Sequence, residues 1–443
     1  VTPHFDDADG TTPTVLDERA EIGNLSRNIL IRAVDDSLWQ TAGFGAHVMV
    51  MGLSSTLEID GVEFHRVGQA GELGRYPLHW HGLSYTPAGA ELGDATGHYL
   101  RNSSIHESAN RCVTIHGTNG VLVQDNICSD VLGHAIFFED GVERRNTVEG
   151  NLVLDVRAPL AQNALKPHDV GAAVGSRGGA SGAWVTHPDN TVVNNTFADA
   201  EGFGLWLAFA QQPVGLFAAV PTRPFREQFG DFDGNTMHSN RLNGVMFDFA
   251  EIDDAGTLAE LQYASTIDGA DLAWPYDNLL RFEIADWTLW KNGMNNFWNR
   301  VVWPTYRGFV SADGEGKSFA GSGAGGLITR SLLVGRSLND GTPQPHPHAG
   351  PPVAFATYHS AFDMTENVIV NFTHEQGLTS GAFASDDYYL RPVEKGHARN
   401  TDNVLIASHG GHRSRADVDE QLTNNFAMGF DYFRFAGALW DPE

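Results

Sequence analysis

The sequence predicts an all-β protein, a right-handed parallel β-helix (solenoid) with long inserted loops. Short runs rich in β-branched and aromatic residues recur at intervals of roughly 22 to 26 residues, or about twice that. Within each run, apolar and polar residues alternate with the period of two that places strand side chains on opposite faces. Asn or Gly stands beside the runs, where turns use left-handed backbone angles. Stacked units of this kind form a solenoid with laddered Asn side chains, whereas a β-sandwich gives no reason for a repeated Asn corner.

The strands are expected to form two sets that stack on different faces of the solenoid. The first set is predicted at residues 57–68, 99–108, 121–131, 146–156, 190–200, 235–245, 362–372 and 400–408. The second set lies between them, at residues 75–82, 110–117, 133–141, 182–187, 203–208 and 244–249. Each run is short, is bounded by Gly, Asn or Asp, and is rich in residue types that favour strands.

Residues 1–443 are expected to form a single β-helix domain, because the repeat extends through most of the chain. Irregular segments rich in Pro, Gly or Asp interrupt the coils near residues 213–232, 251–278, 311–326 and 339–352. Loops of this length on a rigid scaffold commonly shape a binding cleft or cover a strand edge. The aromatic C-terminal segment, residues 418–443, is expected to cap the last coil.

The composition argues against several classes of partner. The 443 residues include 55 acidic and 28 basic side chains, and the net charge of −27 disfavours binding to nucleic acid or to anionic membranes. No run of 18 apolar residues is present, so no membrane span is expected. Asp outnumbers Glu by 34 to 21 and Lys occurs four times. We expect a secreted or cell-surface protein, and the Asp-rich surface would suit a marine or halophilic bacterium.

The two cysteines, Cys112 and Cys128, are too few for a disulfide framework and lack the paired spacing of a zinc knuckle. They can form at most one bridge. The sequence favours two unpaired, half-buried thiols over a disulfide.

A cluster of polar side chains emerges when the second set of strands is aligned at the terminal Gly residues. His81 then lies beside His116, and Glu139 follows in register on the next coil. Leu78, Val113 and Ile136 share the apolar side, which must face the core. The opposite, outward face therefore carries His79 together with His81, His116 and Glu139.

This cluster has the composition of a transition-metal site. Neutral imidazole is the commonest protein ligand for such metals, and a carboxylate completes a mixed site with room for water. His79, His81, His116 and Glu139 are the predicted ligands of a divalent ion, with zinc as the first expectation and nickel, copper or iron as alternatives. The competing interpretation is a set of solvated or singly hydrogen-bonded histidines.

Two further residues of the predicted strand at residues 133–141, which contains Glu139, are candidates for catalysis. Strict alternation turns Asp140 away from Glu139, so Asp140 is expected to hold the turn or to act from the edge of a cleft. His134 begins this strand and is expected to be a fourth ligand or to support the ligands, with a corner hydrogen bond as the alternative.

On later coils, aromatic residues occupy the outward strand position that His79 occupies on its own coil. Trp184 and Trp206 occupy equivalent positions on later coils and are predicted to stack against sugar rings. Arg75 and Arg111, with Lys166, flank the same face and are predicted to bind the carboxylates of a chain-like acidic ligand. The alternative for each Arg is a surface ion pair with one of the abundant Asp residues.

Seven segments resemble a known family. They are RAEIGNLSRNILI, GAHVMVMG, VEFHRVGQAGELGRYPLHWH, RNSSIHESANRCVTIHG, VLGHAIFFEDGVERRNTVEGNLVL, WVTHPDNTVVNNTFADAEGFGLWL and FDGNTMHSNRLNGVMFDF, in order over about residues 19–249. They are similar to the β-helix region of the family of the cell-migration-inducing hyaluronidase, its transmembrane relative and the fibrocystin-like proteins. The resemblance implies hyaluronan binding or depolymerisation, and the chain looks like a bacterial relative without the glycine-containing β-domain of the animal members.

Two functions follow as hypotheses. The first is an extracellular, metal-dependent enzyme that cleaves an acidic, uronic-acid or glycosaminoglycan-like polysaccharide by elimination or hydrolysis, with Glu139, Asp140, His134 and Lys166 as the catalytic candidates. The second is a non-catalytic module that binds glycan or mediates adhesion, in which the metal is structural. A structural metal tends to be fully ligated by protein, whereas a catalytic metal keeps an open position.

Overall fold

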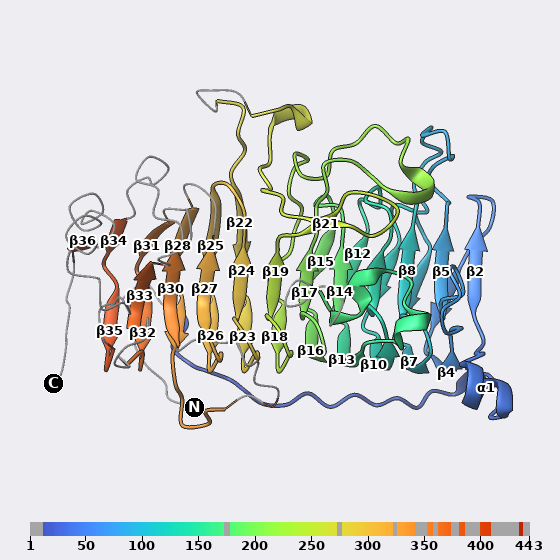
Figure 1. Ribbon diagram of the computed structural model, residues 1–443, viewed down its shortest axis with the longest axis horizontal. Helices are drawn as coiled ribbons and strands as arrows, with labels where there is room; N and C mark the ends of the chain where they lie inside the picture. The colour runs from blue at the N-terminus through green and yellow to red at the C-terminus, as the bar shows by residue number, and fades with distance from the viewer. Residues whose placement is uncertain are drawn as a thin grey trace. The chain divides into compact units, whose positions relative to one another are not determined.

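The structure is a computed structural model that describes residues 12–171, 178–272, 277–321, 326–341, 343, 352–357, 362–373, 381–385, 399–408 and 434–436. Its elements are almost all β-strands, together with the short helix α1 (Ser37–Ala42) (Figure 1). The chain divides into two compact units. One contains residues 20–236 and 246–279, and the other contains residues 1–19, 237–245 and 280–443. The chain crosses between them four times, after residue 19, within β18 (Thr236–His238), within β19 (Val245–Phe247) and after residue 279.

In the first unit, each coil passes through three parallel sheets in turn. One sheet contains β1 (Ile29–Arg32), β4 (Val62–Val67), β7 (Ser104–Ser108), β10 (Ile127–Leu132), β13 (Leu152–Arg157) and β16 (Thr196–Ala200). The next contains β2 (Val48–Met51), β5 (Leu78–His81), β8 (Val113–His116), β11 (Ile136–Phe138), β14 (Ala183–Val185) and β17 (Leu205–Leu207). The third contains β3 (Glu58–Asp60), β6 (Tyr99–Arg101), β9 (Leu122–Gln124), β12 (Thr147–Glu149) and β15 (Thr191–Val193). This order is that of a parallel β-helix, as predicted.

The corners between strands use the predicted Asn ladder. The side-chain amide of Asn126 donates to the side-chain oxygen of Asn151 at 3.0 Å, that of Asn151 donates to Asn195 at 2.9 Å, and that of Asn195 donates to Asn235 at 3.1 Å. All four side chains are buried. Each amide therefore supplies the hydrogen bond that its buried neighbour would otherwise make to water, and buried polar groups need such a partner.

The inserted segments of this unit contain short elements of their own. They are the 3₁₀ helices η1 (Ala161–Asn163), η2 (Pro167–Asp169), η4 (Gly215–Phe217) and η5 (Ile267–Gly269) and the antiparallel pair β20 (Ala250–Glu251) and β21 (Leu258–Ala259). Figure 1 shows the loops of residues 213–232 and 251–272 rising beside the strand ends of the coils. Residues 213–232, 251–272 and 277–278 contribute no strand to the three sheets.

The second unit repeats the three-sheet pattern. One sheet contains β22 (Phe282–Ala285), β25 (Pro304–Arg307), β28 (Gly326–Thr329), β31 (Phe362–Thr365), β34 (Arg399–Thr401) and β36 (Arg434–Ala436). The next contains β23 (Thr288–Trp290), β26 (Val310–Ala312), β29 (Leu332–Val334), β32 (Val368–Val370) and β35 (Val404–Ile406). The third contains β24 (Phe297–Asn299), β27 (Lys317–Gly321), β30 (Val353–Thr357) and β33 (Gly381–Ser385). Neighbouring strands with a defined register are parallel, such as β25 and β28.

One predicted insertion of the second unit is wrong. The segment 311–326 was expected to be irregular, but it contains the end of β26, all of β27 and the first residue of β28. Its described Gly residues misled the prediction, because Gly314 and Gly316 lie between β26 and β27, and Gly321 and Gly326 lie in β27 and β28. Most of the predicted insertion 339–352 and of the predicted cap 418–443 lies outside the described residues, with β36 as the described part of the cap.

The cysteine prediction is also wrong, because Cys112 and Cys128 form a disulfide bond. Their Cα atoms lie 6.1 Å apart, which is within the range that a disulfide spans. Both side chains are buried inside the first unit. Sequence spacing did not reveal the pair, because only the coil geometry brings residues 16 apart in sequence into contact.

Among the described residues, no helix combines the length and apolarity that crossing a membrane would need.

Candidate functional site

The predicted register of the histidine cluster is confirmed. In the parallel pair β5 and β8, His81 lies opposite His116 and His79 lies opposite Thr114. In the pair β8 and β11, Phe138 lies opposite Ile115, so Glu139 follows beside His116. One donor nitrogen from each of the three imidazoles lies within 4.8 Å of the other two. Two adjacent coils therefore bring the three rings together.

The predicted solvent exposure of this face is wrong. His79, Phe137, Trp184 and Trp206 are buried, as are the core residues on the opposite face of the same strands. Inserted segments cover the outer face, and strand alternation carries no information about such a cover. Among the imidazoles of the cluster, His81 keeps the most solvent contact and is half-buried.

The buried ring of His79 has a defined tautomer and a free nitrogen. Its Nδ1 lies 3.1 Å from the carbonyl oxygen of Gly74, and only a protonated nitrogen can donate to that acceptor. Nε2 therefore carries the lone pair, and this buried nitrogen has no hydrogen-bond partner. Burial, together with the nearby His116 and His81, lowers the pKa of His79 to about 2. A neutral imidazole that donates one ring N–H to a carbonyl oxygen and keeps the other nitrogen for the metal is the usual form of a histidine ligand.

His81 and His116 face each other through their Nδ1 atoms, which lie 3.0 Å apart. Two imidazole nitrogens at this distance repel unless a proton or a cation lies between them. The pKa of His81 is lowered by burial and by His116. The second nitrogen of His116, Nε2, lies 3.0 Å from an Asp140 oxygen, which fixes the ring.

Glu139 and Asp140 both reach His116, so the predicted separation of the two carboxylates is wrong. Nδ1 of His116 lies 3.4 Å from Glu139, and Nε2 contacts Asp140. Strand β11 ends at Phe138, so alternation no longer applies to the two residues that follow. Burial alone would lower the pKa of His116, but the charge of Glu139 and the hydrogen bond to Asp140 raise it to about 9.

Two buried residues that sequence reasoning missed hold this site in place. The hydroxyl of Tyr76 lies 3.3 Å from Glu139 Oε1 and donates to that carboxylate. Glu143 accepts backbone N–H groups from Gly117 at 2.8 Å and from Gly141 at 2.9 Å, which ties the turn after β11 to the neighbouring coil. Tyr76 and Glu143 stand within the quoted sequence motifs, but nothing in the alternation pattern marked them.

A covering segment, residues 213–220, closes one side of the site. The backbone N–H of Phe217 donates to Asp140 Oδ2 at 3.0 Å, and its ring lies edge-on against His116 with 5.2 Å between centroids. Gly117 has a φ of 54°, and a Cβ atom there would overlap the Phe217 ring. The N–H of Gly215 donates to Asp254 at 2.7 Å. The covering segment is thus anchored at Asp140 and at the β20–β21 turn.

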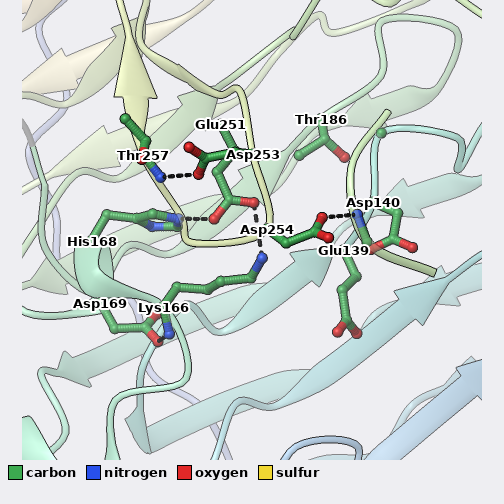
Figure 2. A network of polar contacts seen from close by, with 12 residues as sticks. Glu139, Asp140, Lys166, His168, Asp169, Thr186, Glu251, Asp253, Asp254 and Thr257 are labelled. Carbon is green, nitrogen blue, oxygen red and sulfur yellow. Dashed lines mark hydrogen bonds and ion pairs between the residues drawn. The ribbon is translucent and has the colours of Figure 1, made fainter. Parts of the chain in front are cut away.

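A second buried network starts at His134. Figure 2 shows its other end, at His168, Glu251 and Lys166. The N–H of Ser181 donates to His134 Nδ1 at 3.1 Å, so His134 carries its proton on Nε2 and donates to His168 Nδ1 at 2.9 Å. His168 Nε2 then donates to Glu251 Oε1 at 2.7 Å. The ammonium of Lys166 donates to the other oxygen of Glu251 at 2.9 Å. Because every nitrogen of His134 and His168 is used, His134 is not available as the predicted fourth metal ligand.

Lys166 is held as a cation at the end of this network. Burial lowers its pKa, but the charge of Glu251 and the hydrogen bond between them outweigh burial, so the pKa is raised. The charges of Glu139 and Asp140 act in the same direction. Lys166 therefore suits electrostatic binding of an anion better than removal of a proton.

Arg111 does not fit its predicted contact with substrate. Its guanidinium is 1% exposed and forms a two-pronged ion pair with Asp169, which is also buried. The guanidinium also lies over the Phe137 ring, 4.1 Å from the centroid. Alignment could not reveal this partner, because Asp169 belongs to η2 in an inserted segment. Arg75, by contrast, is exposed as expected, and its Nη1 lies 3.3 Å from His47.

Trp184 and Trp206 do not form the predicted sugar platform. They are stacked on adjacent coils in register and are fully buried. Their rings pack edge-to-face at 4.5 Å, and Trp184 also stacks on His168 at 4.4 Å. The two indoles form an apolar wall around the His134 network rather than a surface.

Residues 43–245 match the family model described as the CEMIP β-helix. This part of the chain belongs to the CEMIP β-helix family. The resemblance predicted from the sequence motifs is confirmed. All of the clustered imidazoles and both carboxylates lie within the CEMIP β-helix, together with Lys166 and the covering segment, whereas Glu251 lies beyond the matched residues.

Relatives with assigned names match over a larger part of the chain. The human protein named cell surface hyaluronidase CEMIP2 is 30% identical over 364 residues, which cover 74% of this chain and 26% of that protein. The zebrafish cell surface hyaluronidase is 27% identical over 365 residues, with the same two shares. Human fibrocystin-L is 34% identical over 268 residues, or 52% of this chain and 6% of that protein. The chain thus spans about a quarter of the length of the two hyaluronidases.

Proposed function

We propose that this protein is an extracellular, metal-dependent enzyme that cleaves an acidic polysaccharide of the hyaluronan type. The observation that carries the proposal is the buried, unpartnered Nε2 of His79, which shares a small space with the imidazoles of His81 and His116 and with Glu139. An unpartnered buried nitrogen is costly, and a bound cation removes that cost.

The donor set favours a divalent transition metal. Three imidazoles and one carboxylate are a common ligand set for zinc, which is our first choice, and they also suit nickel, copper and iron. The ion would displace the proton that His116 keeps at neutral pH because of its raised pKa. His79 would ligate through Nε2, and His81 and His116 through Nδ1. Asp140 accepts from the far nitrogen of His116, as supporting carboxylates do in metal sites. Such an ion would supply Lewis-acid activation of a sugar carboxylate or of water.

The proposed substrate class rests on three supports. Relatives at about 30% identity are named cell surface hyaluronidases. The disulfide between Cys112 and Cys128 suits an oxidising, extracellular environment. Lys166 provides a fixed cation near Glu139, and Arg75 provides an exposed one, so an acidic chain can be bound locally despite the net charge of −27. The marine or halophilic source stays a prediction.

The residues allow two routes of cleavage. In elimination, Lys166 would neutralise the uronate carboxylate, which acidifies the C5 proton. Hydroxide from solvent would take that proton, and the glycosidic oxygen would leave with a proton from water as the double bond forms. In hydrolysis, the three imidazoles would hold the ion, and Glu139 would stay outside the ligand set. Glu139 would donate a proton to the leaving oxygen as water adds to the sugar, since burial raises its pKa and favours the protonated acid. Tyr76, whose pKa burial raises well above 10, would stay protonated and orient Glu139.

One observation favours a glycan-binding module with a structural metal instead. Apart from His81, the imidazoles and carboxylates of the centre are buried, and the covering segment closes over Asp140. A fully enclosed ion leaves no position for substrate or water. The two proposed functions differ in whether the bound polysaccharide is cleaved.

The test is an incubation of hyaluronan and of a neutral polysaccharide of equal length with zinc-loaded and metal-stripped protein. New reducing ends report cleavage, and ultraviolet absorbance of an unsaturated product separates elimination from hydrolysis. The proposal expects cleavage of hyaluronan alone, which depends on metal and is lost in His116→Ala. Glu149→Gln, which removes a carboxylate from β12 outside the centre, is the control and should behave as the original protein.

Cleavage by metal-stripped protein, or full activity in His116→Ala, would contradict the proposal. Retention of hyaluronan with stoichiometric metal and no new reducing ends would establish the binding module instead.

A further inference from the structure

A second cluster of imidazoles and carboxylates lies on another sheet of the first unit. It is formed by Glu63 and His65 on β4 and by His106 and Glu107 on β7. The register of these parallel strands places His65 directly opposite His106. None of these residues belongs to the first histidine cluster, which is formed by His79 and His81 on β5, His116 on β8 and Glu139 in the turn after β11.

The local backbone explains why both a histidine and its neighbour face outward here. Arg66 and Glu107 follow the two histidines and adopt left-handed angles, with φ of 55° and 48°. A residue in this conformation interrupts the alternation of a strand, so that two successive side chains emerge on one face. Neither His106 nor Glu107 is buried, whereas Ile105 before them is in the core.

The four side chains converge as crossed pairs. The rings of His65 and His106 are stacked with 4.5 Å between centroids and 17° between planes. His106 Nε2 lies 3.1 Å from Glu63 Oε1 on the preceding coil, and His65 Nε2 lies 3.0 Å from Glu107 Oε1 on the following coil. Donor atoms of Glu63, His65 and His106 all lie within 4.8 Å of one another.

The nitrogen of His65 distinguishes this cluster from a set of ordinary ion pairs. His65 Nε2 is buried and makes no hydrogen bond, although Glu107 is close, because the contact lacks the direction that a hydrogen bond needs. In the His134 network the equivalent nitrogens are all used, which leaves no donor for a cation. At His65, as at His79, a buried ring nitrogen that makes no hydrogen bond lies beside other groups that can ligate a metal.

We propose that Glu63, His65, His106 and Glu107 form a second metal site, which takes a zinc ion and joins two successive coils. Two imidazoles and two carboxylates can supply the four ligands of a tetrahedral zinc site. The side chains of Glu63, His65 and His106 are 13–15% exposed, so the ion would be held mostly by protein near the surface. The bound ion would stabilise the folded state, because the unfolded chain does not hold the ligands together.

The experiment measures the zinc bound per chain in a variant that lacks two ligands of the first histidine cluster. His81→Ala and His116→Ala are combined, and zinc bound after gel filtration is measured alone and with His65→Gln and His106→Gln added. The proposal expects about one zinc per chain to remain in the double variant and to be lost in the quadruple variant. Glu149→Gln in the double variant is the matched control, and it should leave the count unchanged.

Thermal unfolding provides a second readout that does not depend on activity. Zinc should raise the Tm of the double variant but not that of the quadruple variant, and the two Tm values should agree in a chelator, which shows that both fold. Zinc retained by a folded quadruple variant, or absent from the double variant, would overturn the proposal. The proposed enzyme function is untouched by either result, because its centre is absent from both variants.

Discussion

Replacing Asp169 with Asn should lower the free energy of unfolding by about 4 kcal/mol, because it leaves a buried guanidinium without its counter-ion. Asp169 and Arg111 are each 1% exposed, and Asp169 also accepts the backbone N–H of Lys166 at 3.0 Å. Removing one partner of a buried pair costs roughly 3–5 kcal/mol. The Arg111 charge lowers the pKa of Asp169, so the carboxylate is ionised at neutral pH.

Urea unfolding followed by tryptophan fluorescence measures the effect. The control is Asp60→Asn, because Asp60 pairs with Arg101 at the surface, where the two side chains are 43% and 40% exposed. An exposed pair is worth at most about 1 kcal/mol. The double variant Arg111→Met/Asp169→Leu should recover most of the loss, since no buried charge is left unpaired. Equal losses for Asp169→Asn and Asp60→Asn would refute the assignment of a buried ion pair.

Three further predictions concern other residues. Burial lowers the pKa of His187 to about 3 from its ordinary value of about 6.5, so the free energy of unfolding should fall as the pH drops below about 6.5, by up to about 1.4 kcal/mol per pH unit. His187→Gln should flatten this dependence in urea titrations. The double variant Cys112→Ala/Cys128→Ala should lose about 3 kcal/mol in the same assay, as expected for a short closed loop. Asp140→Asn should weaken zinc binding by about 10- to 100-fold in chelator competition, because His116 loses its orienting carboxylate; unchanged affinity would contradict that role.

The sequence predicted the strand register well, because register depends on local alternation and on the Asn corners. His81 beside His116, and Trp184 beside Trp206, follow from aligning the runs at their terminal Gly. The Asn ladder from Asn126 was predictable for the same reason. A period of two and a repeated corner leave few alternative registers.

Burial and partners were not predictable in this way. Trp184 lies on the expected face, but inserted segments cover that face, and no local pattern shows where an insertion folds back. Asp169, the partner of Arg111, and Glu251, the partner of Lys166, belong to such segments. Alternation also fails where a strand ends, which explains the position of Asp140.

A metal ion is proposed to lie among His79, His81, His116 and Glu139. Anomalous X-ray scattering at the zinc edge, from crystals of the zinc-loaded protein, can locate it. We expect a peak within about 2.0–2.1 Å of His79 Nε2 and of the Nδ1 atoms of His81 and His116. A map with no peak at these nitrogens, in protein that retains stoichiometric zinc, would contradict it.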